Sequence, residues 1–258
     1  MGTLAPTHSY PLPARLAVVG AGRLGTALGL ALRSAGLEVE GPLGAGDRPA
    51  ATDAVLLCVP DSEIGSAAAT VAGSSPLVGH TSGATPLSAL APAGAVAFGL
   101  HPLQTFAGGE GAQRFLGAGC AVAGETGSAL ALATSLAERL GMTAFAISDS
   151  QRGAYHAAAS IASNFLVTLQ AGAEQVAGGA GLEPAEARAL LAPLVRSTIE
   201  NWAAVGPQQA LTGPIARGDH ATVERQRTAV GDTAPELLAL FDALAERTRA
   251  LAGSEALA

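Results

Sequence analysis

Residues 15–25 read R-L-A-V-V-G-A-G-R-L-G, an apolar stretch typical of a buried strand that leads directly into a glycine-rich turn. The helix-forming residues 26–34 follow the turn. In this context of strand, turn and helix, the pattern G-x-G-x-x-G is typical of a dinucleotide-binding site. Gly20 permits the tight turn, Gly22 lets the backbone approach a pyrophosphate, and Gly25 lets the helix pack closely on the strand. The alternative is an ordinary glycine-rich turn in a chain rich in alanine and glycine.

The composition predicts a globular protein with one large domain or two ordinary ones. Of the 258 residues 49% are hydrophobic but only 3% are aromatic, so the core must be packed with alanine, leucine and valine. The net charge of −7 argues against a nucleic-acid partner, because phosphate contacts need a basic face. Cys58 and Cys120 lie in apolar runs, and we expect them to be buried thiols in a reducing compartment.

The sequence carries no signal for export or for membrane insertion. Residues 1–14 contain prolines but lack the basic and apolar regions of a signal peptide, so we expect a flexible N-terminal segment. No apolar run reaches the ~18 residues that a transmembrane helix needs. We therefore expect a cytoplasmic protein without a membrane partner.

Short apolar runs alternate with helix-forming stretches up to about residue 149. This alternation predicts a mostly parallel, doubly wound sheet with helices on both faces. The helix candidates include 62–72 and 127–140, and the predicted strands are 16–19, 37–40, 54–59, 77–79, 96–100, 120–123 and 143–147. We therefore expect an α/β dinucleotide-binding domain over residues 15–149.

From residue 150 onward the pattern predicts helices alone. Residues 150–177 read as one long helix, Pro184 stands where another begins, and Pro193 is expected to break or restart it. Thr233 and Glu236 have the spacing of a capping box at the start of a last helix that reaches about residue 251. Residues 150–258 are thus predicted to form an all-helical C-terminal domain.

Polar residues at the ends of three predicted strands mark a candidate site, because ligands of open α/β sheets bind at the carboxyl ends of strands. Asp61 follows the strand 54–59 and is expected to cap the next helix. His80 and His101 follow the next two strands, beside Ser82 and Gln104. Either histidine alone could serve only to bond the backbone, but two at neighbouring strand ends favour a ligand site.

A second polar feature lies on the predicted helix 150–177. His156, Ser160 and Asn164 are spaced four residues apart and so share one helix face. Two interpretations stay open: a hydrogen-bond network between helices, or one wall of an active site. His80, His101 and His156 have neither the spacing nor the accompanying carboxylate of a metal site, so we expect no metal.

The stretch 210–219, A-L-T-G-P-I-A-R-G-D, predicts a loop between two helices. Asp219 can cap the helix that follows it. Arg217 either binds a substrate carboxylate through two hydrogen bonds or simply faces solvent.

Six stretches together resemble a known family: GAGRLG (20–25), VLLCVPDSEI (55–64), HTSGA (80–84), HPLQTF (101–106), YHAAASIASNF (155–165) and LTGPIARGD (211–219). Over residues 14–252 the chain resembles the Rossmann-like plus DUF2520 proteins of the 6-phosphogluconate dehydrogenase-like superfamily. That superfamily includes ketopantoate reductases, β-hydroxyacid dehydrogenases and pyrroline-5-carboxylate reductases. The resemblance implies a Rossmann domain followed by a helical domain that often dimerises.

The resemblance implies an NAD(P)-dependent oxidoreductase that transfers hydride to a small 2-oxo acid, ketopantoate-like, or to a cyclic imine acid. His156 is expected to donate the proton, since a histidine pKa of ~6.5 suits a general acid. Ser160 and Asn164 would orient the substrate, and the expected substrate-binding residues are Ser82, His101, Gln104 and Arg217. Related reductases carry a lysine that residues 155–165 lack. A non-catalytic NADP-binding sensor or scaffold therefore stays the alternative.

The loop after the second predicted strand favours NADP over NAD, which stays the alternative. Residues 41–46 carry no acid to bond the ribose hydroxyls, and two nearby arginines can supply positive charge to a 2′-phosphate. The residues expected to bind the cofactor are Gly20, Gly22, Arg23, Leu24, Gly25, Arg48, Val59, Pro60 and Ser82.

A homodimer is expected through the helical domain. A domain of about a hundred residues struggles to bury several apolar helix faces by itself, and a two-fold dimer is the common solution. One such face consists of Leu190, Leu191, Leu194, Val195 and Trp202, and the other of Leu237, Leu238, Leu240, Phe241 and Leu244.

Overall fold

The computed structural model describes residues 11–44, 46–108 and 111–253 and divides into two units, one up to Ser163 and one from Asn164 onward. Most of the expected N-terminal segment, residues 1–10, lies outside the described residues. The domain boundary expected after residue 149 differs from the division in the structure. The helix that follows residue 151 belongs to the first unit, because its first turn is bonded to that unit's loops.

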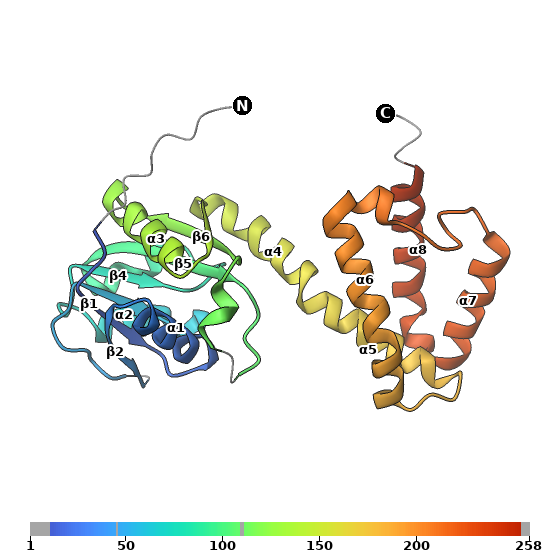
Figure 1. Cartoon of the computed structure of the whole chain (residues 1–258), viewed down its shortest axis with the longest axis horizontal. Helices are drawn as coiled ribbons and strands as arrows, with labels where there is room; N and C mark the ends of the chain where they lie inside the picture. Colours follow the sequence, from blue (N-terminus) through green and yellow to red (C-terminus); the bar gives the residue numbers. More distant parts are fainter. Residues whose placement is uncertain (1–10, 45, 109–110, 254–258) are drawn as a thin grey trace. The chain divides into compact units, whose positions relative to one another are not determined.

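The first unit contains a seven-stranded sheet in the order β2-β1-β3-β4-β5-β6-β7 (Figure 1). All seven strands were predicted from the sequence, with ends that shift by a few residues. Their bounds are β1 Arg15–Val19, β2 Glu38–Leu43, β3 Ala54–Leu57, β4 Leu77–His80, β5 Val96–Leu103, β6 Gly119–Gly124 and β7 Thr143–Ala146.

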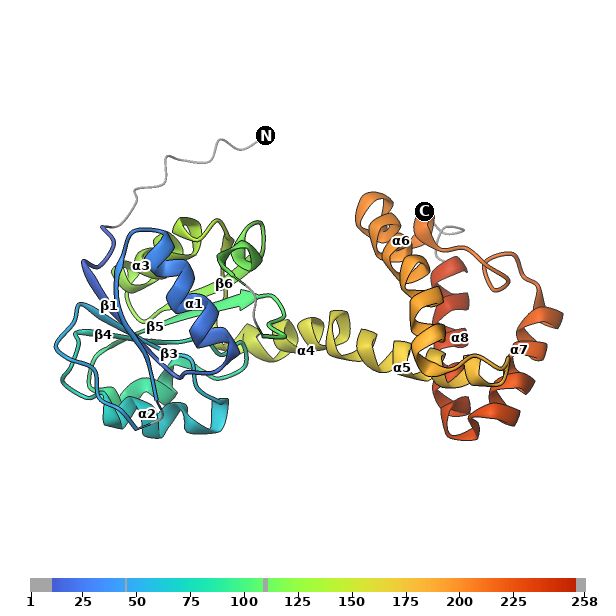
Figure 2. The ribbon, with the colours of Figure 1, turned by 60° about the horizontal axis from the view of Figure 1, so that its bottom comes forward.

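Helices cover both faces of this sheet, as the alternating pattern predicted. Figure 2 shows α1 (Arg23–Ser34) and α3 (Gly127–Arg139) on one face and α2 (Ile64–Thr70) on the other. Apolar side chains of α1 and α3 pack with one set of strand residues, and those of α2 and the 3₁₀ helix Leu87–Ala93 pack with the alternate set. This two-sided burial explains why β1 and β3 are almost entirely apolar.

The sheet is mixed, not wholly parallel. The strands β1 to β5 are parallel, whereas β6 runs antiparallel to β5 and β7 runs parallel to β6. The carboxyl ends of β1 to β5 therefore share one edge, and those of β6 and β7 lie at the opposite edge. The fold is the predicted Rossmann-like α/β domain followed by a helical region.

The prediction of one helix over 150–177 was wrong. The helix α4 (Arg152–Ala162) ends at Ser163, which has φ −119° and ψ −71°, and α5 (Asn164–Gly178) starts a new helix. Serine and asparagine side chains bond the nearby backbone in ways that compete with the helical ladder, so a Ser-Asn pair is a weak point in a helix. A capping box, Ser148 with Gln151, precedes α4 and was not predicted.

The prediction for Asp61 was also wrong, because the helical turn begins one residue earlier than expected. The chain turns at Pro60, which is the N-cap, and Asp61 is the first residue of the 3₁₀ helix Asp61–Glu63 without a side-chain cap bond. The N–H of Glu63 bonds the carbonyl of Pro60 instead.

The second unit is helical, as predicted, and consists of α5, α6 (Pro184–Ala210), α7 (His220–Thr233) and α8 (Leu238–Gly253). Asp219 caps α7 as expected, because its carboxylate accepts from the N–H of Thr222. The described residues contain no helix that is long and apolar enough to cross a membrane.

Two predicted helix boundaries in this unit were wrong. Pro193 does not break α6. Proline removes only one backbone donor, and this loss is compensated because the neighbouring alanines, leucines and arginines are strong helix formers. The non-helical residue is Gly206, with φ +80°, directly before Pro207. Thr233 makes no capping box with Glu236, because it ends α7 and the N-cap of the next turn is Ala234.

Candidate active site at the carboxyl edge of the sheet

The glycine-rich turn joins β1 to α1, and its three glycines meet different steric demands. Gly20 has φ +112°, and a Cβ there would lie 2.2 Å from the carbonyl oxygen of Cys58. A Cβ on Gly25 would lie 1.9 Å from the carbonyl oxygen of Gly20. A Cβ on Gly22, the N-cap of α1, would meet no atom within 4 Å. The backbone is closely packed beneath the turn and open above Gly22, as a bound pyrophosphate requires.

Polar residues lie at the carboxyl ends of β4 and β5 along the same edge of the sheet, and His101 is within β5, where it pairs with Ala121 of β6. The N–H of Thr81, directly after β4, donates to the carbonyl of Leu57 in β3 at 3.1 Å. Gly83 packs against the imidazole of His101, since a Cβ there would lie 2.9–3.1 Å from three ring atoms. The carboxyl ends of β3, β4 and β5 thus form a continuous edge that begins at the glycine-rich turn.

The loop after β4 is held together by its own side chains. Ser82 Oγ accepts from the N–H groups of Ala84 and Thr85 at 3.1 and 2.9 Å and donates to the Thr85 hydroxyl at 3.0 Å. The N–H of Ser82 donates to Nδ1 of the fully buried His80 at 3.2 Å. The Ser82 hydroxyl, which we expected to contact cofactor and substrate, therefore shapes the loop in this structure.

His101 is hydrogen-bonded to Tyr155 of α4. The distance from His101 Nδ1 to the phenolic oxygen is 2.5 Å, and the two rings meet edge to face. The ring of Phe145 in β7 also meets the ring of Tyr155 edge to face, and the ring of His156 lies 6.3 Å from that of His101. Tyr155 is a candidate site residue that the sequence analysis missed, because it lies outside the polar stripe of α4.

Burial keeps this pair uncharged near neutral pH. It lowers the pKa of His101 to about 4, and the neighbouring His156 and Arg152 act in the same direction. Burial likewise lowers the pKa of His80 to about 4 and raises the pKa of Tyr155 to about 12. His101 and Tyr155 can therefore exchange hydrogen bonds without either carrying a charge.

Arg152 joins the first turn of α4 to the loop after β4. Its side chain is 3% exposed, and it donates to the Asp149 carboxylate at 2.6 Å and to the Ser82 carbonyl at 3.3 Å. The Asp149 carboxylate also accepts from the N–H of Leu87 at 3.1 Å. Sequence analysis missed Arg152, because an Asp-Arg pair three residues apart is ordinarily a solvated surface pair.

The other predicted site residues of the first unit have varied surroundings. Ser160 is half-buried one helical turn after the exposed His156. The amide of Gln104 bonds two backbone groups near its own loop. Arg48 donates to the carbonyl of Ala72 at 2.5 Å, so its guanidinium supports the end of α2.

Two predicted site residues belong to the second unit. Asn164 is the exposed first residue of α5, and Arg217 is exposed in the loop before α7. Their roles stay predictions, and the expected polar stripe from His156 to Asn164 is interrupted by the break at Ser163.

The two cysteines are unpaired thiols. Cys120 is buried in β6, and Cys58 is partly buried beneath the glycine-rich turn. Burial raises the pKa of both thiols to about 12, so neither is a nucleophile at neutral pH.

A family model described as "Domain of unknown function (DUF2520)" matches residues 118–248, half of the chain. The chain belongs to the DUF2520 family. The match confirms the resemblance inferred from the sequence motifs. It includes β6, β7, α4 and most of the second unit, so Arg152, Tyr155 and His156 lie within the DUF2520 region.

Solved structures similar to this DUF2520 protein share its fold at low sequence identity. A protein described as an NADP oxidoreductase from Bacteroides fragilis has a TM-score of 0.77 at 19% identity, with 92% of this chain and 98% of that chain covered. A Thermotoga maritima protein has a TM-score of 0.73 at 23% identity, with 93% of this chain and 99% of that chain covered. The NADP-bound pyrroline carboxylate reductase from Plasmodium falciparum has a TM-score of 0.59 at 11% identity, with 92% of this chain and 98% of that chain covered. None of the curated proteins matches the chain.

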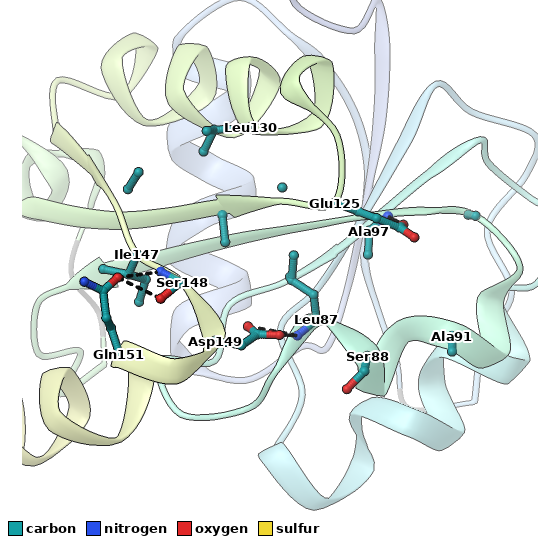
Figure 3. Close-up of a pocket in the computed structure, with 14 residues that line it drawn as sticks. Leu87, Ser88, Ala91, Ala97, Glu125, Leu130, Ile147, Ser148, Asp149 and Gln151 are labelled. Atoms are coloured by element: carbon teal, nitrogen blue, oxygen red, sulfur yellow. Dashed lines mark hydrogen bonds between the residues drawn. The ribbon is translucent and has the colours of Figure 1, made fainter.

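A hollow of about 830 Å³ lies at the other edge of the DUF2520 protein's sheet, between the start of β5 and the ends of β6 and β7. Figure 3 shows its polar side chains turned to internal partners: Asp149 to Leu87, Gln151 to Ser148, and Glu125 toward Ala97. The remaining lining is mostly alanine, leucine and isoleucine. The hollow therefore offers little to orient a polar substrate, and it contains none of the predicted site residues.

No group of three or more metal-ligating side chains close enough to hold an ion occurs among residues 11–44, 46–108 and 111–253. The side chains at the carboxyl edge of the sheet include neutral imidazole, phenol and hydroxyl groups and the guanidinium of Arg152.

Proposed function

We propose that this DUF2520 protein is an NADP-dependent oxidoreductase that reduces a small carbonyl or imine acid. One observation carries the proposal: the open glycine turn and the His101–Tyr155 pair lie on the same edge of one sheet, joined by the strand ends between them. That edge is where open α/β sheets bind nucleotides and substrates. Two similar structures, described as an NADP oxidoreductase and an NADP-bound pyrroline carboxylate reductase, support the same reaction class.

The residues of the glycine turn fit a dinucleotide. The space above Gly22 would hold the pyrophosphate, and the N-terminus of α1 would supply N–H donors and partial positive charge. Arg23, the exposed first residue of α1, is our candidate for contact with the 2′-phosphate of NADP. Arg48 is a weaker candidate than we expected, because it is bonded to the end of α2. The cofactor supplies a hydride when bound; the protein must position the substrate and supply a proton.

His101, Tyr155 and His156 are the groups that can hold and move a proton near this edge. His156 is exposed and lies against His101, so a proton from either imidazole is available to a substrate bound between the sheet edge and α4. Ser160 on the next turn of α4 is a candidate for orienting that substrate.

The function is tested by adding NADPH, with NADH in parallel, to the purified protein and a panel of 2-oxo acids and cyclic imine acids. We expect loss of absorbance at the nicotinamide band with at least one of these two substrate classes. In a fluorescence titration we expect NADPH to bind at least about tenfold more tightly than NADH, because a charged hydrogen bond to the 2′-phosphate strengthens binding. Tight NADPH binding without any turnover would instead support a nucleotide-binding sensor or scaffold. Equal affinities for the two cofactors would contradict the proposed NADP preference.

The assembly that fits the second unit is a homodimer. Its fully buried side chains are few and small among the described residues: Ala187, Val223, Val230, Ala234 and Ala245. Large apolar side chains on its helices remain exposed, and Leu190, Leu194 and Trp202 are each more than half exposed. A second copy would cover these faces.

A further inference from the structure

We propose that His101 is the proton donor of the reaction, that Tyr155 is the positioning residue that sets its tautomer, and that the group reduced is a carbonyl and not a protonated imine. The inference rests on the proposed function and names the substrate class within it. It replaces His156, the donor expected from the sequence, with a residue whose hydrogen bond, packing and position are fixed by the fold.

The surroundings of His101 hold its ring in one orientation. Nδ1 is 2.5 Å from the Tyr155 hydroxyl, and the ring edge of Nδ1, Cε1 and Nε2 rests on Gly83, where a Cβ would lie 2.9–3.1 Å from these three atoms. Tyr155 is itself fixed by the edge-on ring of Phe145. Nε2 has no hydrogen bond to another described residue, and His101 lies beyond the last residue pair of β4 and β5, His80 with Gly99, at the carboxyl edge. One ring nitrogen is therefore committed to Tyr155, and the other has no hydrogen-bond partner among the described residues.

The tautomer follows from the partners of the phenol. A half-buried tyrosine hydroxyl ordinarily finds an acceptor. Among the described residues, the hydrogen-bond partner of the Tyr155 hydroxyl is His101 Nδ1. When the hydroxyl donates to Nδ1, the imidazole proton must be on Nε2. The available nitrogen is then an N–H donor.

Burial is the main reason that the pair stays neutral, and the surrounding charges modify its effect. His156 and Arg152 on α4 and His80 on β4 lower the pKa of His101, Asp61 raises it, and burial outweighs them all. The pKa of Tyr155 is raised by burial, while Arg152 acts to lower it. Near pH 7 the imidazole thus donates through Nε2 as a neutral group, and Arg152 is the cation that stabilises negative charge arriving on Tyr155.

The proposed step balances without a charged imidazole. The carbonyl carbon gains the hydride that reduced nicotinamide supplies, and the π electron pair of the C=O bond moves to oxygen. That oxygen takes the proton from His101 Nε2 as Nδ1 takes the phenolic proton of Tyr155. The negative charge ends on the phenolate, and the product is a neutral hydroxyl. Nδ1 then returns its proton to the phenolate as Nε2 takes a proton from solvent water, so hydroxide leaves to solvent and the starting tautomer is restored.

The same geometry disfavours a protonated imine. A carbonyl oxygen has lone pairs that accept the Nε2 hydrogen bond, and it becomes an alkoxide that needs a proton. The nitrogen of a protonated imine has no lone pair to accept that bond, and its reduction yields a neutral amine without a proton donor. Among the two substrate classes in the proposed function, a free N–H donor therefore matches the 2-oxo acid.

The first test compares His101→Asn, Tyr155→Phe and the control His220→Asn, an exposed histidine at the start of α7, in steady-state assays with NADPH. For 2-oxo acids we expect kcat to fall about 10²-fold in His101→Asn, the usual effect of losing a general acid. We expect kcat to fall about tenfold in Tyr155→Phe, while KM and NADPH affinity stay within about twofold of wild type. The wild-type kcat should stay nearly constant from pH 6 to 8, whereas a cationic imidazole donor would lose activity as the pH rises above ~6.5.

The second test needs no turnover. In ¹⁵N NMR spectra of the cofactor-free protein, His101, assigned by its loss in His101→Asn, should carry its proton on Nε2 at pH 7, and Tyr155→Phe should produce a mixture of tautomers. A proton on Nδ1 would overturn the inference. So would preferred turnover of cyclic imines, or unchanged kcat in His101→Asn; both outcomes leave the proposed oxidoreductase function intact. Absence of any turnover by the wild type would overturn the function and the proton-donor role together.

Discussion

At the scale of the residue, the three glycines of the turn separate folding from binding. Gly22 has an ordinary φ of −73° and open space beside it, so Gly22→Val should leave the fold intact while its side chain occupies the space for the pyrophosphate. We expect NADPH affinity to fall more than about 100-fold, since close backbone approach is lost. The control is Gly127→Val, at the exposed start of α3, where a Cβ also meets nothing within 4 Å.

The measurement is a fluorescence titration with NADPH, accompanied by thermal unfolding of both variants. Gly22→Val should unfold within a few degrees of Gly127→Val. Full NADPH affinity in Gly22→Val would place the dinucleotide somewhere other than this turn.

A second residue-scale prediction concerns pH and stability. The pKa of His101 is about 4 in the folded protein and about 6.5 in the unfolded chain, so the unfolded chain binds the extra proton first. The stabilisation from neutral, buried His101 is full above pH 6.5 and is lost as the pH falls toward 4. It is on the order of 3 kcal/mol.

Urea unfolding of wild type and His101→Asn at pH 7 and pH 4.5 measures this pH-dependent loss of stability. Carboxylates titrate in both proteins, so their contribution cancels in the comparison. The free energy of unfolding should therefore fall less steeply with pH in His101→Asn, which lacks the buried imidazole, than in wild type. His220→Asn should follow the wild-type curve. Parallel curves for wild type and His101→Asn would contradict a depressed pKa at His101.

At the scale of the element, α4 is anchored to the sheet by its first turn. Arg152→Met should keep the side-chain volume but remove the bonds to Asp149 and Ser82, which leaves the Ser82 carbonyl without this donor and the Asp149 carboxylate with only the N–H of Leu87. We expect a loss of about 2–3 kcal/mol in the free energy of unfolding, below the range for a pair buried on both sides because Asp149 is partly exposed.

The matched control is Arg188→Met, which removes an arginine bonded to Glu174 on the exposed surface of the second unit. Chemical denaturation should show a much smaller loss for this variant. Hydrogen exchange should then localise the effect of Arg152→Met to residues 80–87 and the first turn of α4. Equal losses in the two variants would mean that Arg152 does not anchor α4.

At the scale of the whole molecule, the exposed apolar faces of the second unit predict a homodimer. Leu194 is 64% exposed on α6, and Leu194→Glu should place a charge in the interface and shift the protein toward monomers. Leu116→Glu is the control, because Leu116 is 65% exposed in the first unit. Light scattering at micromolar concentration should give a dimer mass for wild type and Leu116→Glu. A monomer mass for the wild type would refute the dimer.

The sequence by itself determined the strands and one helix cap. Alternating apolar runs located all seven strands, the glycine pattern located the turn between β1 and α1, and Asp219 was recognised as a helix cap. These features depend on side-chain period, backbone freedom or a hydrogen bond to a residue three positions away. Such signals are complete within a short stretch of chain, so sequence is enough to read them.

Only the tertiary structure decided the direction of β6, the break at Ser163, and the partners of Arg152 and Tyr155. Tyr155 bonds a histidine 54 residues earlier, and Arg152 bonds a carbonyl 70 residues earlier. In sequence, each stands in a helical stretch like any other polar residue. Their burial, and with it the shifted pKa values of Tyr155 and His101, arises when α4 packs against strand ends that the chain formed much earlier, because desolvation depends on every neighbour in space and not on neighbours in sequence.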